Sequence, residues 1–335
     1  MPKNIVICCD GTGNEYCKKK TNVAKLFDIV ENRGDRQVAY YDPGVGTLGS
    51  TYAITWFGKK LSWLFGLAFA FGLPENIEDA YSFLMDNYED GDRIYLFGFS
   101  RGAYTVRALG GMIMKCGLLH KEHKNLIPYA TKLYRNRKKK RNSETVVGFR
   151  NAFSHKRCIP YFIGVWDTVK SVGVRNKIRF ADSKLAEEIP FGYHALSIDE
   201  KRFKFRPVLW ESSNTRAQTI EQVWFPGVHC DVGGSYDRDG LSDTALKWMA
   251  KKARAQGLIV DTELLDKIIP NCGQKPNKSF KWFWLILGFY RRKIKAGDLV
   301  HSAAMKRMDK VKGYRPRNLL KVRDQVVIID DEIGC

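Results

Sequence analysis

Short, continuous apolar runs recur along this chain of 335 residues, and several of them end in Gly or Asp. They do not alternate with polar positions, which is the pattern of strands buried on both faces of a parallel sheet. The sequence therefore predicts five such strands, at Ile5–Cys9, Val38–Tyr41, Arg93–Phe99, Ile159–Trp166 and Gln222–Val228.

Segments with helical spacing lie between these runs. Asn76–Tyr88 follows Pro74 and places apolar residues three and four positions apart, on one face of a helix. Ala103–Met114 is a second predicted helix, and Leu241–Gln256, with Ser242 as its N-cap, is a third. This alternation predicts the α/β class: a doubly wound, mostly parallel sheet with helices on both faces.

The chain contains no internal repeat and no convincing linker, so a single domain over residues 1–335 is expected. Two lid-like insertions are expected in it, at about residues 50–73 and 120–157. The C-terminal part, residues 261–335, fits the strand and helix pattern less closely.

Composition changes this picture mainly through charge. Hydrophobic residues make up 44% of the chain and charged residues 27%, which excludes a disordered or coiled-coil protein. Lys and Arg number 56 against 36 Asp and Glu, a net charge of +20. Such an excess calls for an anionic partner, either a phospholipid surface or a nucleic acid, and charge alone does not choose between them.

Two segments concentrate the basic residues. Residues 124–141 carry eight basic side chains and no acidic one. This pattern is typical of either a solvated surface or an anion-binding patch. Residues 275–295 place an apolar, aromatic run between basic flanks, which suits either a membrane interface or a buried element with basic ends. The candidate substrate or membrane contacts are Trp282, Phe283, Trp284, Phe289 and Tyr290.

The N-terminal residues lack the pattern of a signal peptide, and no window is long and apolar enough to span a bilayer. We therefore expect a cytoplasmic protein that is soluble or peripheral to a membrane, with export by a leaderless route left open. The eight cysteines are scattered without a C-x-x-C pair, so neither disulfides nor a zinc site is expected. No metal and no cofactor is predicted.

The strongest chemical signal is the sequence Gly98-Phe99-Ser100-Arg101-Gly102, which matches G-x-S-x-G between a predicted strand and a predicted helix. In that context the motif forms a sharp turn that presents the Ser hydroxyl at the C-terminal edge of a sheet. Ser100 is therefore the candidate nucleophile. The alternative is a tight turn that contains Ser by chance.

A serine nucleophile needs a base and an acid that orients the base. His229 follows a predicted strand and opens a glycine-rich turn, and Asp167 ends the strand YFIGVW, so these two are the first candidates. His301 competes as the base, and Asp231 would then serve as its acid. Asp167 could instead cap a helix.

The oxyanion formed by attack on an ester needs at least two hydrogen-bond donors. We expect the backbone N–H of Arg101 to be one and a donor from the loop at Gly11 and Thr12 to be another. Asp10 could hold this loop by accepting its backbone N–H groups. A phosphate-binding loop is disfavoured because the G-x-x-x-x-G-K-[ST] spacing is missing.

Several strings occur together and in order over roughly residues 3–260: CDGTGN, TNV, YYDPGVGT, LFGFSRGAYTVRALGGMI, GLL, GVWDTV, LWE, VWFPGVHCDVGGSY and LSDTALKWM. In them the chain resembles the α/β-hydrolase family known as domain of unknown function 2235. Its best-known members are the first class of type VI secretion phospholipase effectors. The large added C-terminal region of the long effectors has no counterpart here.

The resemblance implies a Ser-Asp-His esterase that acts on the acyl esters of glycerophospholipids, with Ser100, Asp167 and His229 at the matching positions. A serine hydrolase of a soluble ester is the first alternative, and a basic nucleic-acid-binding protein on an inactive hydrolase scaffold is the second. The sequence shows no stacking platform for bases, so nucleic acid is not the expected partner. It indicates no protein partner, head-group preference, acyl position, oligomeric state or biological role.

Overall fold

The computed structural model describes residues 2–11, 19–32, 34–44, 58–169, 184–212, 215–275, 277, 288–331 and 333, and only the backbone of residues 58–71. Its centre is one eight-stranded sheet with the order β2-β1-β3-β4-β5-β6-β7-β8, in which every pairing is parallel. The strands are β1 (Asn4–Cys9), β2 (Gln37–Asp42), β3 (Arg93–Phe99), β4 (Pro160–Trp166), β5 (Phe191–Ser197), β6 (Thr219–Phe225), β7 (Leu299–His301) and β8 (Val327–Ile329). The predicted α/β class is confirmed.

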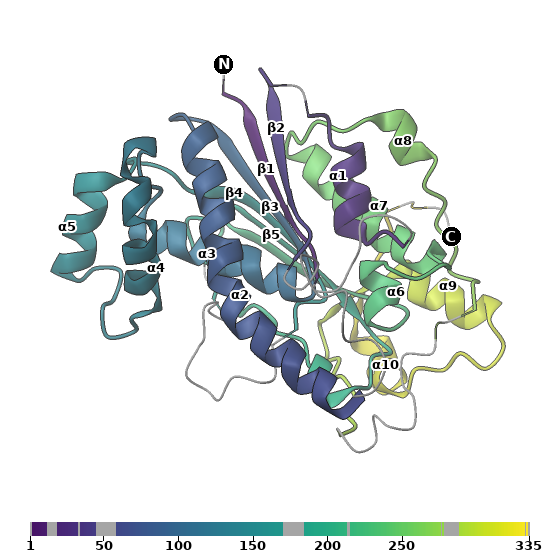
Figure 1. Cartoon of the computed structure of the whole chain (residues 1–335). Helices are drawn as coiled ribbons and strands as arrows, with labels where there is room; N and C mark the ends of the chain where they lie inside the picture. Colours follow the sequence, from purple (N-terminus) through teal and green to yellow (C-terminus); the bar gives the residue numbers. More distant parts are fainter. Residues whose placement is uncertain are drawn as a thin grey trace.

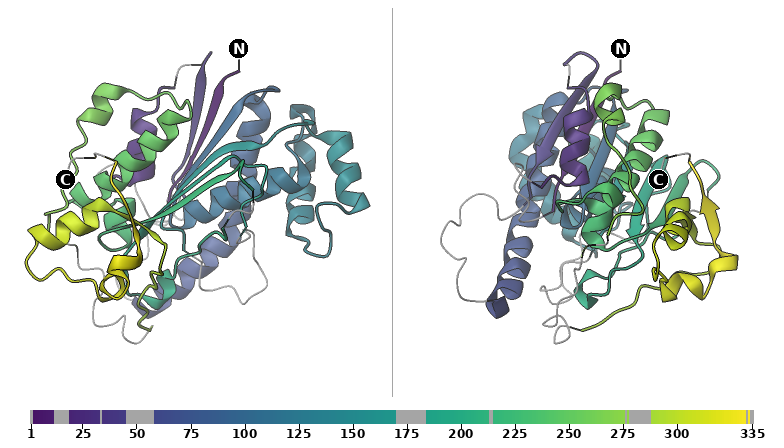
Figure 2. Two further views of the ribbon diagram at one scale, coloured as in Figure 1. Left: turned by 180° about the vertical axis from the view of Figure 1, so that it is seen from behind. Right: turned by 90° about the vertical axis from the view of Figure 1, so that its right-hand side faces the viewer.

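The strands lie between two layers of helices (Figures 1 and 2). The principal helices are α1 (Asn22–Ile29), α2 (Gly58–Asn87), α3 (Arg101–Cys116), α4 (Ile127–Arg135), α5 (Glu144–Phe153), α6 (His229–Gly233), α7 (Gly240–Ala255), α8 (Thr262–Asp266), α9 (Ser302–Lys310) and α10 (Arg317–Leu320). Of the helices described, none has the length and apolar character to cross a bilayer.

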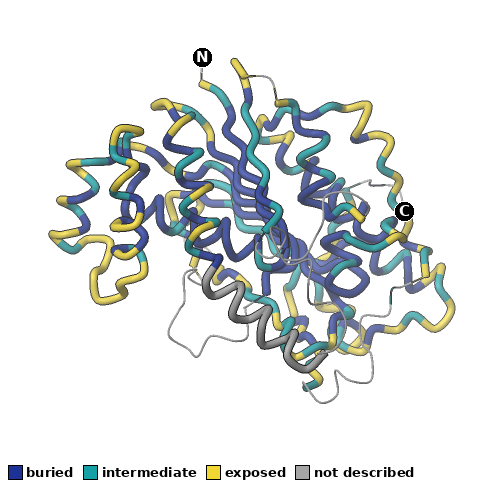
Figure 3. The backbone as a smooth tube through the Cα atoms, in the orientation of Figure 1, coloured by how far each residue is buried: buried dark blue, intermediate teal, exposed yellow. Residues whose placement is uncertain are grey.

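Alternate residues of each central strand face opposite layers. In β1, Ile5 and Ile7 pack with residues of α2 and α3, whereas Val6 and Cys8 pack with residues of α1 and α7. Because both faces are covered, every position of β1 is buried. The continuous apolar run in the sequence follows directly from this arrangement (Figure 3).

Three strands were missed by the sequence prediction. β5 reads FGYHALS and carries His, Ser and Gly, while β7 and β8 have three residues each. One predicted boundary was also wrong, because α2 begins at Gly58 and continues through Pro74. A proline inside a helix removes one hydrogen bond but does not always end the helix.

The residues around 120–157 form helices α4 and α5, preceded by the 3-10 turn η1 (Lys121–Leu126), and lie to one side of the sheet (Figure 1). The C-terminal elements α9 and α10 lie toward the opposite edge, where β7 and β8 extend the same sheet (Figure 2). Cys272 is disulfide-bonded, which contradicts the expectation of free thiols, whereas Cys8, Cys9, Cys116, Cys158 and Cys230 are free.

The strand order reverses direction at β1. The chain passes from β1 to β2 on one side and then crosses to β3 on the other, so the loops after β1 and β3 diverge. In open parallel sheets, such a switch point leaves a crevice outside the carboxyl ends of the strands, where ligands bind. The loop at Gly11 and the turn at Ser100 both begin at this point.

Candidate active site

Ser100 lies in a strained turn between β3 and α3. Its φ angle is 57°, in a region that residues other than glycine rarely occupy. Two glycines make the turn sterically feasible: a Cβ on Gly98 would lie 2.5 Å from the carbonyl oxygen of Gly102, and one on Gly102 would lie 2.1 Å from that of Cys9. The Ser100 amide donates to the carbonyl of Trp166 at 3.0 Å, which ties the turn to the end of β4.

His229 reaches the hydroxyl of Ser100. Its Nε2 lies 2.9 Å from Ser100 Oγ, and its Nδ1 lies 2.5 Å from Asp167 Oδ2. The imidazole is 3% exposed and packs between the rings of Phe99 and Phe205, with centroid distances of 4.7 and 4.9 Å. Burial, opposed in part by Asp167, lowers the pKa of His229 below its ordinary value of 6.5. The ring is therefore neutral near pH 7 and able to accept a proton.

Asp167 is completely buried at the end of β4, and its φ angle of 41° marks a second strained residue. Its Oδ1 accepts from the backbone N–H of Ser197 at 3.0 Å. Burial alone would raise its pKa, but the Arg292 guanidinium and the His229 ring hold the pKa of Asp167 well below its ordinary value of 3.8. This carboxyl is therefore ionised in the folded protein at neutral pH.

Sequence analysis missed Arg292. This side chain is 1% exposed and contacts both carboxylate oxygens of Asp167, with Nη2 at 2.8 Å from Oδ2. It also donates to the carbonyls of Ser197 and Phe205, at 3.1 and 2.8 Å. Arg292 lies in the C-terminal basic flank of residues 275–295, and no local pattern distinguishes it from the other basic residues there.

Two further buried residues support the backbone of the site. Glu200 accepts from the N–H of His229 at 3.3 Å and is held by Arg202 through two contacts, of 2.9 and 2.8 Å. His194 accepts from the N–H of Thr168 at 3.1 Å. Burial lowers the pKa of His194 to about 3, so this ring stays neutral and acts as an acceptor next to Asp167.

The alternative base and acid are used elsewhere. His301 lies 3.0 Å from Asp331 through Nε2, accepts from the N–H of Ala303 through Nδ1, and so caps α9. Asp231 accepts from the N–H of Val228 at 3.0 Å and from Asn277 at 2.7 Å. These contacts occupy both groups at helix starts, and the structure does not pair them with each other.

Of the predicted oxyanion donors, Arg101 is the first residue of α3, directly after Ser100. The N–H of Gly11 donates to Asp10 Oδ1 at 2.6 Å, so it would have to exchange that bond to reach an oxyanion. Asp10 Oδ2 accepts from the hydroxyl groups of Thr21 and Tyr41, at 2.5 and 2.9 Å. Thr12 lies outside the described residues.

The sequence profile of one protein family matches residues 3–252, about three quarters of the chain. That family is described as the catalytic domain of Tle1-like phospholipase effectors of the type VI secretion system. The chain belongs to this family. Membership in the Tle1-like catalytic domain family agrees with the resemblance seen in the sequence motifs.

Individual relatives are longer than this chain. An uncharacterized protein of Saccharomyces cerevisiae, YEL023C, is 36% identical over 220 residues, which are 61% of this chain and 32% of the yeast protein. A crystal structure of an uncharacterized protein from Pseudomonas aeruginosa has a TM-score of 0.47 and 18% identity, and covers 81% of this chain and 49% of that one. The Tle1 effector bound to the VgrG spike has a TM-score of 0.40 and 17% identity, over 70% and 51%. The chain thus spans about a third of the yeast protein and about half of each solved chain.

The proposed membrane contacts are described only in part. Trp282, Phe283 and Trp284 lie outside the described residues. Phe289 is 49% exposed, and its neighbour Tyr290 donates its N–H to the carbonyl of Lys201 at 2.8 Å. This contact pairs the segment that begins at Gly288 with the segment that carries Phe205, the ring against His229.

Among the residues with described positions, no group of three or more His, Cys, Asp or Glu side chains could hold a metal ion. At the site itself, Ser100, His229, Asp167 and Arg292 are buried together. A neutral imidazole next to a hydroxyl, backed by an ionised carboxylate, is suited to nucleophilic attack on an acyl group.

Proposed function

We propose that this chain is a serine esterase of the phospholipase A type, which hydrolyses acyl ester bonds of glycerophospholipids at a membrane surface. The proposal depends above all on one observation, the 2.9 Å contact between His229 Nε2 and Ser100 Oγ in a turn where two glycines permit the strained φ of Ser100. Membership in the Tle1-like phospholipase effector family supports a lipid ester as the substrate.

In the proposed acylation step, Ser100 Oγ attacks the ester carbonyl carbon while its proton passes to His229 Nε2. Asp167 holds the Nδ1 proton of the imidazole and stabilises the imidazolium that forms. The tetrahedral intermediate collapses when the ester C–O bond breaks, and the leaving alcohol of the lysophospholipid takes the proton from His229. The acyl chain remains on Ser100.

The oxyanion of this intermediate would lie at the start of α3, where the first N–H groups of a helix have no partners within the helix. We assign the Arg101 N–H as one donor. The loop after β1 would supply the second, from Gly11 or Thr12. Gly102 brings this loop against the nucleophile turn, because a Cβ there would strike the carbonyl oxygens of Cys9 and Asp10.

Deacylation repeats the same chemistry with water. His229 takes a proton from the water molecule, whose oxygen attacks the acyl carbon, and then returns that proton to Ser100 Oγ as the fatty acid leaves. The lowered pKa of His229 keeps the base neutral near pH 7. No cofactor or metal enters these steps.

We further propose that the face carrying Phe289 and Tyr290 contacts the membrane, together with Trp282, Phe283 and Trp284. Exposed rings next to cations suit the headgroup region of an anionic bilayer. Phe289 is exposed close to Arg291, and Tyr290 lies 4.4 Å from Arg206, so this face combines both features. This proposal is supported by the backbone contact between Tyr290 and Lys201, because the Lys201 segment also carries Phe205, whose ring packs against His229.

A reactive-serine probe tests the proposal. A fluorophosphonate should label the purified protein at Ser100, and the Ser100→Ala variant should neither be labelled nor hydrolyse a phospholipid ester, while its melting temperature stays near that of the wild type. The Ser212→Ala variant makes the same substitution at an exposed position and should behave as the wild type. Turnover by Ser100→Ala near the wild-type rate would refute the assignment.

Substrate choice needs a separate comparison. The same acyl ester should be offered as a monomer and in anionic vesicles, and the rate should rise at the vesicle. A rate that ignores the vesicle would favour a hydrolase of a soluble ester. Nucleic acid binding that depends steeply on salt and is unchanged by Ser100→Ala, without any ester turnover, would favour the inactive-scaffold alternative.

A further inference from the structure

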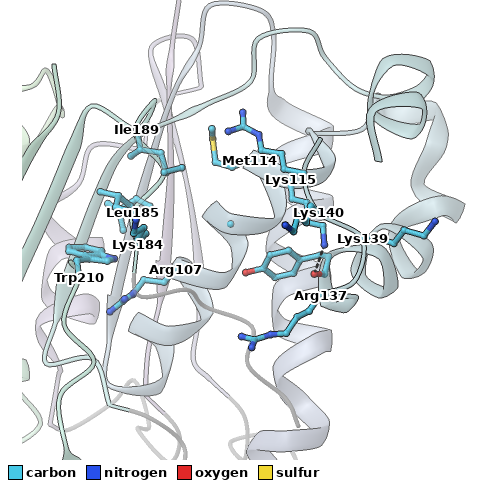
Figure 4. A pocket seen from close by; sticks show the side chains of 15 residues that line it. Arg107, Met114, Lys115, Arg137, Lys139, Lys140, Lys184, Leu185, Ile189 and Trp210 are labelled. Atoms are coloured by element: carbon cyan, nitrogen blue, oxygen red, sulfur yellow. Dashed lines mark hydrogen bonds between the residues drawn. The ribbon is translucent and has the colours of Figure 1, made fainter. Parts of the chain in front are cut away.

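A cavity lies beside the distal half of α3, with a volume of about 500 Å³. Its walls come mainly from α3, the turn after α4 and the segment that precedes β5, and are completed by Tyr134 of α4, Ile163 of β4 and Trp210 (Figure 4). The turn after α4 contains the end of the basic stretch 124–141 noted in the sequence. These residues take no part in the proposed hydrolysis.

Cationic side chains dominate the walls, and none of the described residues that line the cavity is acidic. The basic residues that line it are Arg107, Lys115, Arg137, Lys139, Lys140, Arg141 and Lys184. The labelled members approach the cavity from different sides (Figure 4).

Two carboxylates reach this cluster in the described part of the chain. Arg141 contacts Glu188 at 2.5 Å, and Lys184 lies 3.8 Å from Glu211 with both side chains more than half exposed. Exposed pairs of this kind are weak and exchange readily with other ions. Because the cations outnumber the carboxylates, the cavity retains a strong positive potential.

Other contacts position the cations without removing their charge. Lys115 donates to the carbonyls of Tyr134 and Asn136, at 3.1 and 2.9 Å. Arg107 is 5% exposed, donates to the carbonyl of Val208, and lies 4.8 Å from the ring of Trp210. These two therefore form a fixed inner wall, beneath the exposed cations of the turn.

The cavity is distinct from the candidate active site. Arg107 and Lys115 are seven and fifteen residues beyond Ser100, which corresponds to about 10 and 22 Å along the axis of α3. Helices α4 and α5 lie on the other side of the molecule from α6, which carries His229 (Figure 1).

We propose that this cavity binds a ligand that carries several phosphate groups. Arginine and lysine together suit phosphate, because the guanidinium bonds two oxygens at once and the ammonium supplies a movable point charge. Several cations around one concave site favour several phosphates over one. The volume suits a small polyanion, whereas a nucleic acid duplex would need an extended basic surface. The ligand is either a free polyphosphate or the head group of a multiply phosphorylated phospholipid.

The test is a titration of the full chain with inorganic tripolyphosphate, in which calorimetry records the heat of binding. One saturable site is expected, with an affinity that falls as salt is added. Lys140→Glu should weaken binding by about tenfold or more, because it removes one charge-assisted contact and adds a repulsion. Lys138→Glu is the matched control: it makes the same charge change in the same exposed turn, two residues away, on a residue that does not line the cavity.

A second arm identifies the source of the phosphates. Phosphatidylcholine vesicles with and without phosphatidylinositol bisphosphate are offered to the same three proteins. Binding that needs the phosphorylated lipid, is lost in Lys140→Glu and is displaced by tripolyphosphate supports the head group; tripolyphosphate binding alone supports a soluble ligand. The proposal is overturned if neither probe binds saturably, or if Lys138→Glu and Lys140→Glu lose affinity equally, as an extended RNA-binding surface would require. Because only binding is measured, failure here leaves the proposed hydrolysis untouched.

Discussion

Arg292 contacts both carboxylate oxygens of Asp167, and both side chains are fully buried. The same carboxylate receives the imidazole of His229. A cation at this position keeps Asp167 ionised without water, but it also competes with the imidazole for the negative charge. Burial lowers the pKa of His229 and Asp167 raises it, so Arg292 acts on this base through the carboxylate that both side chains contact.

Replacing Arg292 should change the pH dependence of turnover. In the wild type, the acid limb of kcat/KM should lie below pH 6.5, because the pKa of His229 is lowered. In Arg292→Met the Asp167 charge is no longer shared with a guanidinium and should act more strongly on His229, so the acid limb should move to higher pH. Arg292→Lys keeps the charge and should leave the limb near its wild-type position.

Arg292→Met should also lower the free energy of unfolding by about 3–5 kcal/mol, because it leaves the buried carboxylate of Asp167 without its counterion. Arg307→Met is the control, since Arg307 is also fully buried but bonds the carbonyls of Cys272 and Gln274. It should lower the melting temperature without moving the acid limb. An unmoved limb in Arg292→Met would argue that Arg292 only fills space.

Acid should destabilise the protein through Asp167. Its folded pKa lies below its unfolded value of 3.8, so its contribution to stability is present above that value and is lost as pH falls toward the folded pKa. Unfolding by urea should therefore become easier as pH falls below about 4. In Asp167→Asn, which does not titrate, the stability should be lower at neutral pH and fall less between pH 5 and pH 3.

The two candidate bases should respond differently to truncation. His229→Ala should reduce kcat by about 10⁴-fold or more, since the nucleophile loses its proton acceptor. His301→Ala should retain turnover and lose about 1 kcal/mol of stability, because it removes the cap of α9. Loss of turnover in His301→Ala, with His229→Ala still active, would reverse the assignment.

The nucleophile turn should tolerate no side chain at Gly102. A Cβ there would lie 2.1 Å from a backbone oxygen, so Gly102→Ala must displace β1 from α3 and should cost more than about 3 kcal/mol or abolish folding. Gly148→Ala is the matched control, because nothing lies within 4 Å of its added methyl group in α5. That variant should gain about 0.5–1 kcal/mol in chemical denaturation.

Membrane contact can be tested at a described residue. Phe289→Ser should weaken association with anionic vesicles, since the ring is 49% exposed beside Arg291, and should leave turnover of a monomeric ester unchanged. Ile269→Ser removes a large apolar side chain that is 75% exposed, just after α8, and should have no effect on vesicle binding. Equal losses in both variants would point to nonspecific adsorption.

Sequence patterns predicted the central strands and marked the turn at Ser100 because these depend on local features, whereas the contacts of His229 with Ser100 and Asp167 join residues far apart in the chain. Strands buried on both faces leave continuous apolar runs, and a nucleophile turn needs glycines at fixed spacing. β5 was not predicted because it contains the polar residues His194 and Ser197. Both are buried in the fold, where they form hydrogen bonds with neighbouring groups. β7 and β8 are too short to leave a pattern.

Arg292 could not be predicted for a different reason. Its role depends on a contact across 125 residues, and in sequence it is one of several basic residues after an aromatic run. Charge patterning there suited either a membrane interface or a buried element with basic ends. The fold buries this one cation against Asp167.

The family match ends at residue 252, whereas the counterion of Asp167 comes from residue 292. A fragment trimmed to the limits of the homology would keep Ser100, His229 and Asp167 but would strip the buried carboxylate of its arginine. The charged residues that make up the site therefore extend beyond the residues that the family profile matches. A shortened version of this protein should therefore retain Arg292.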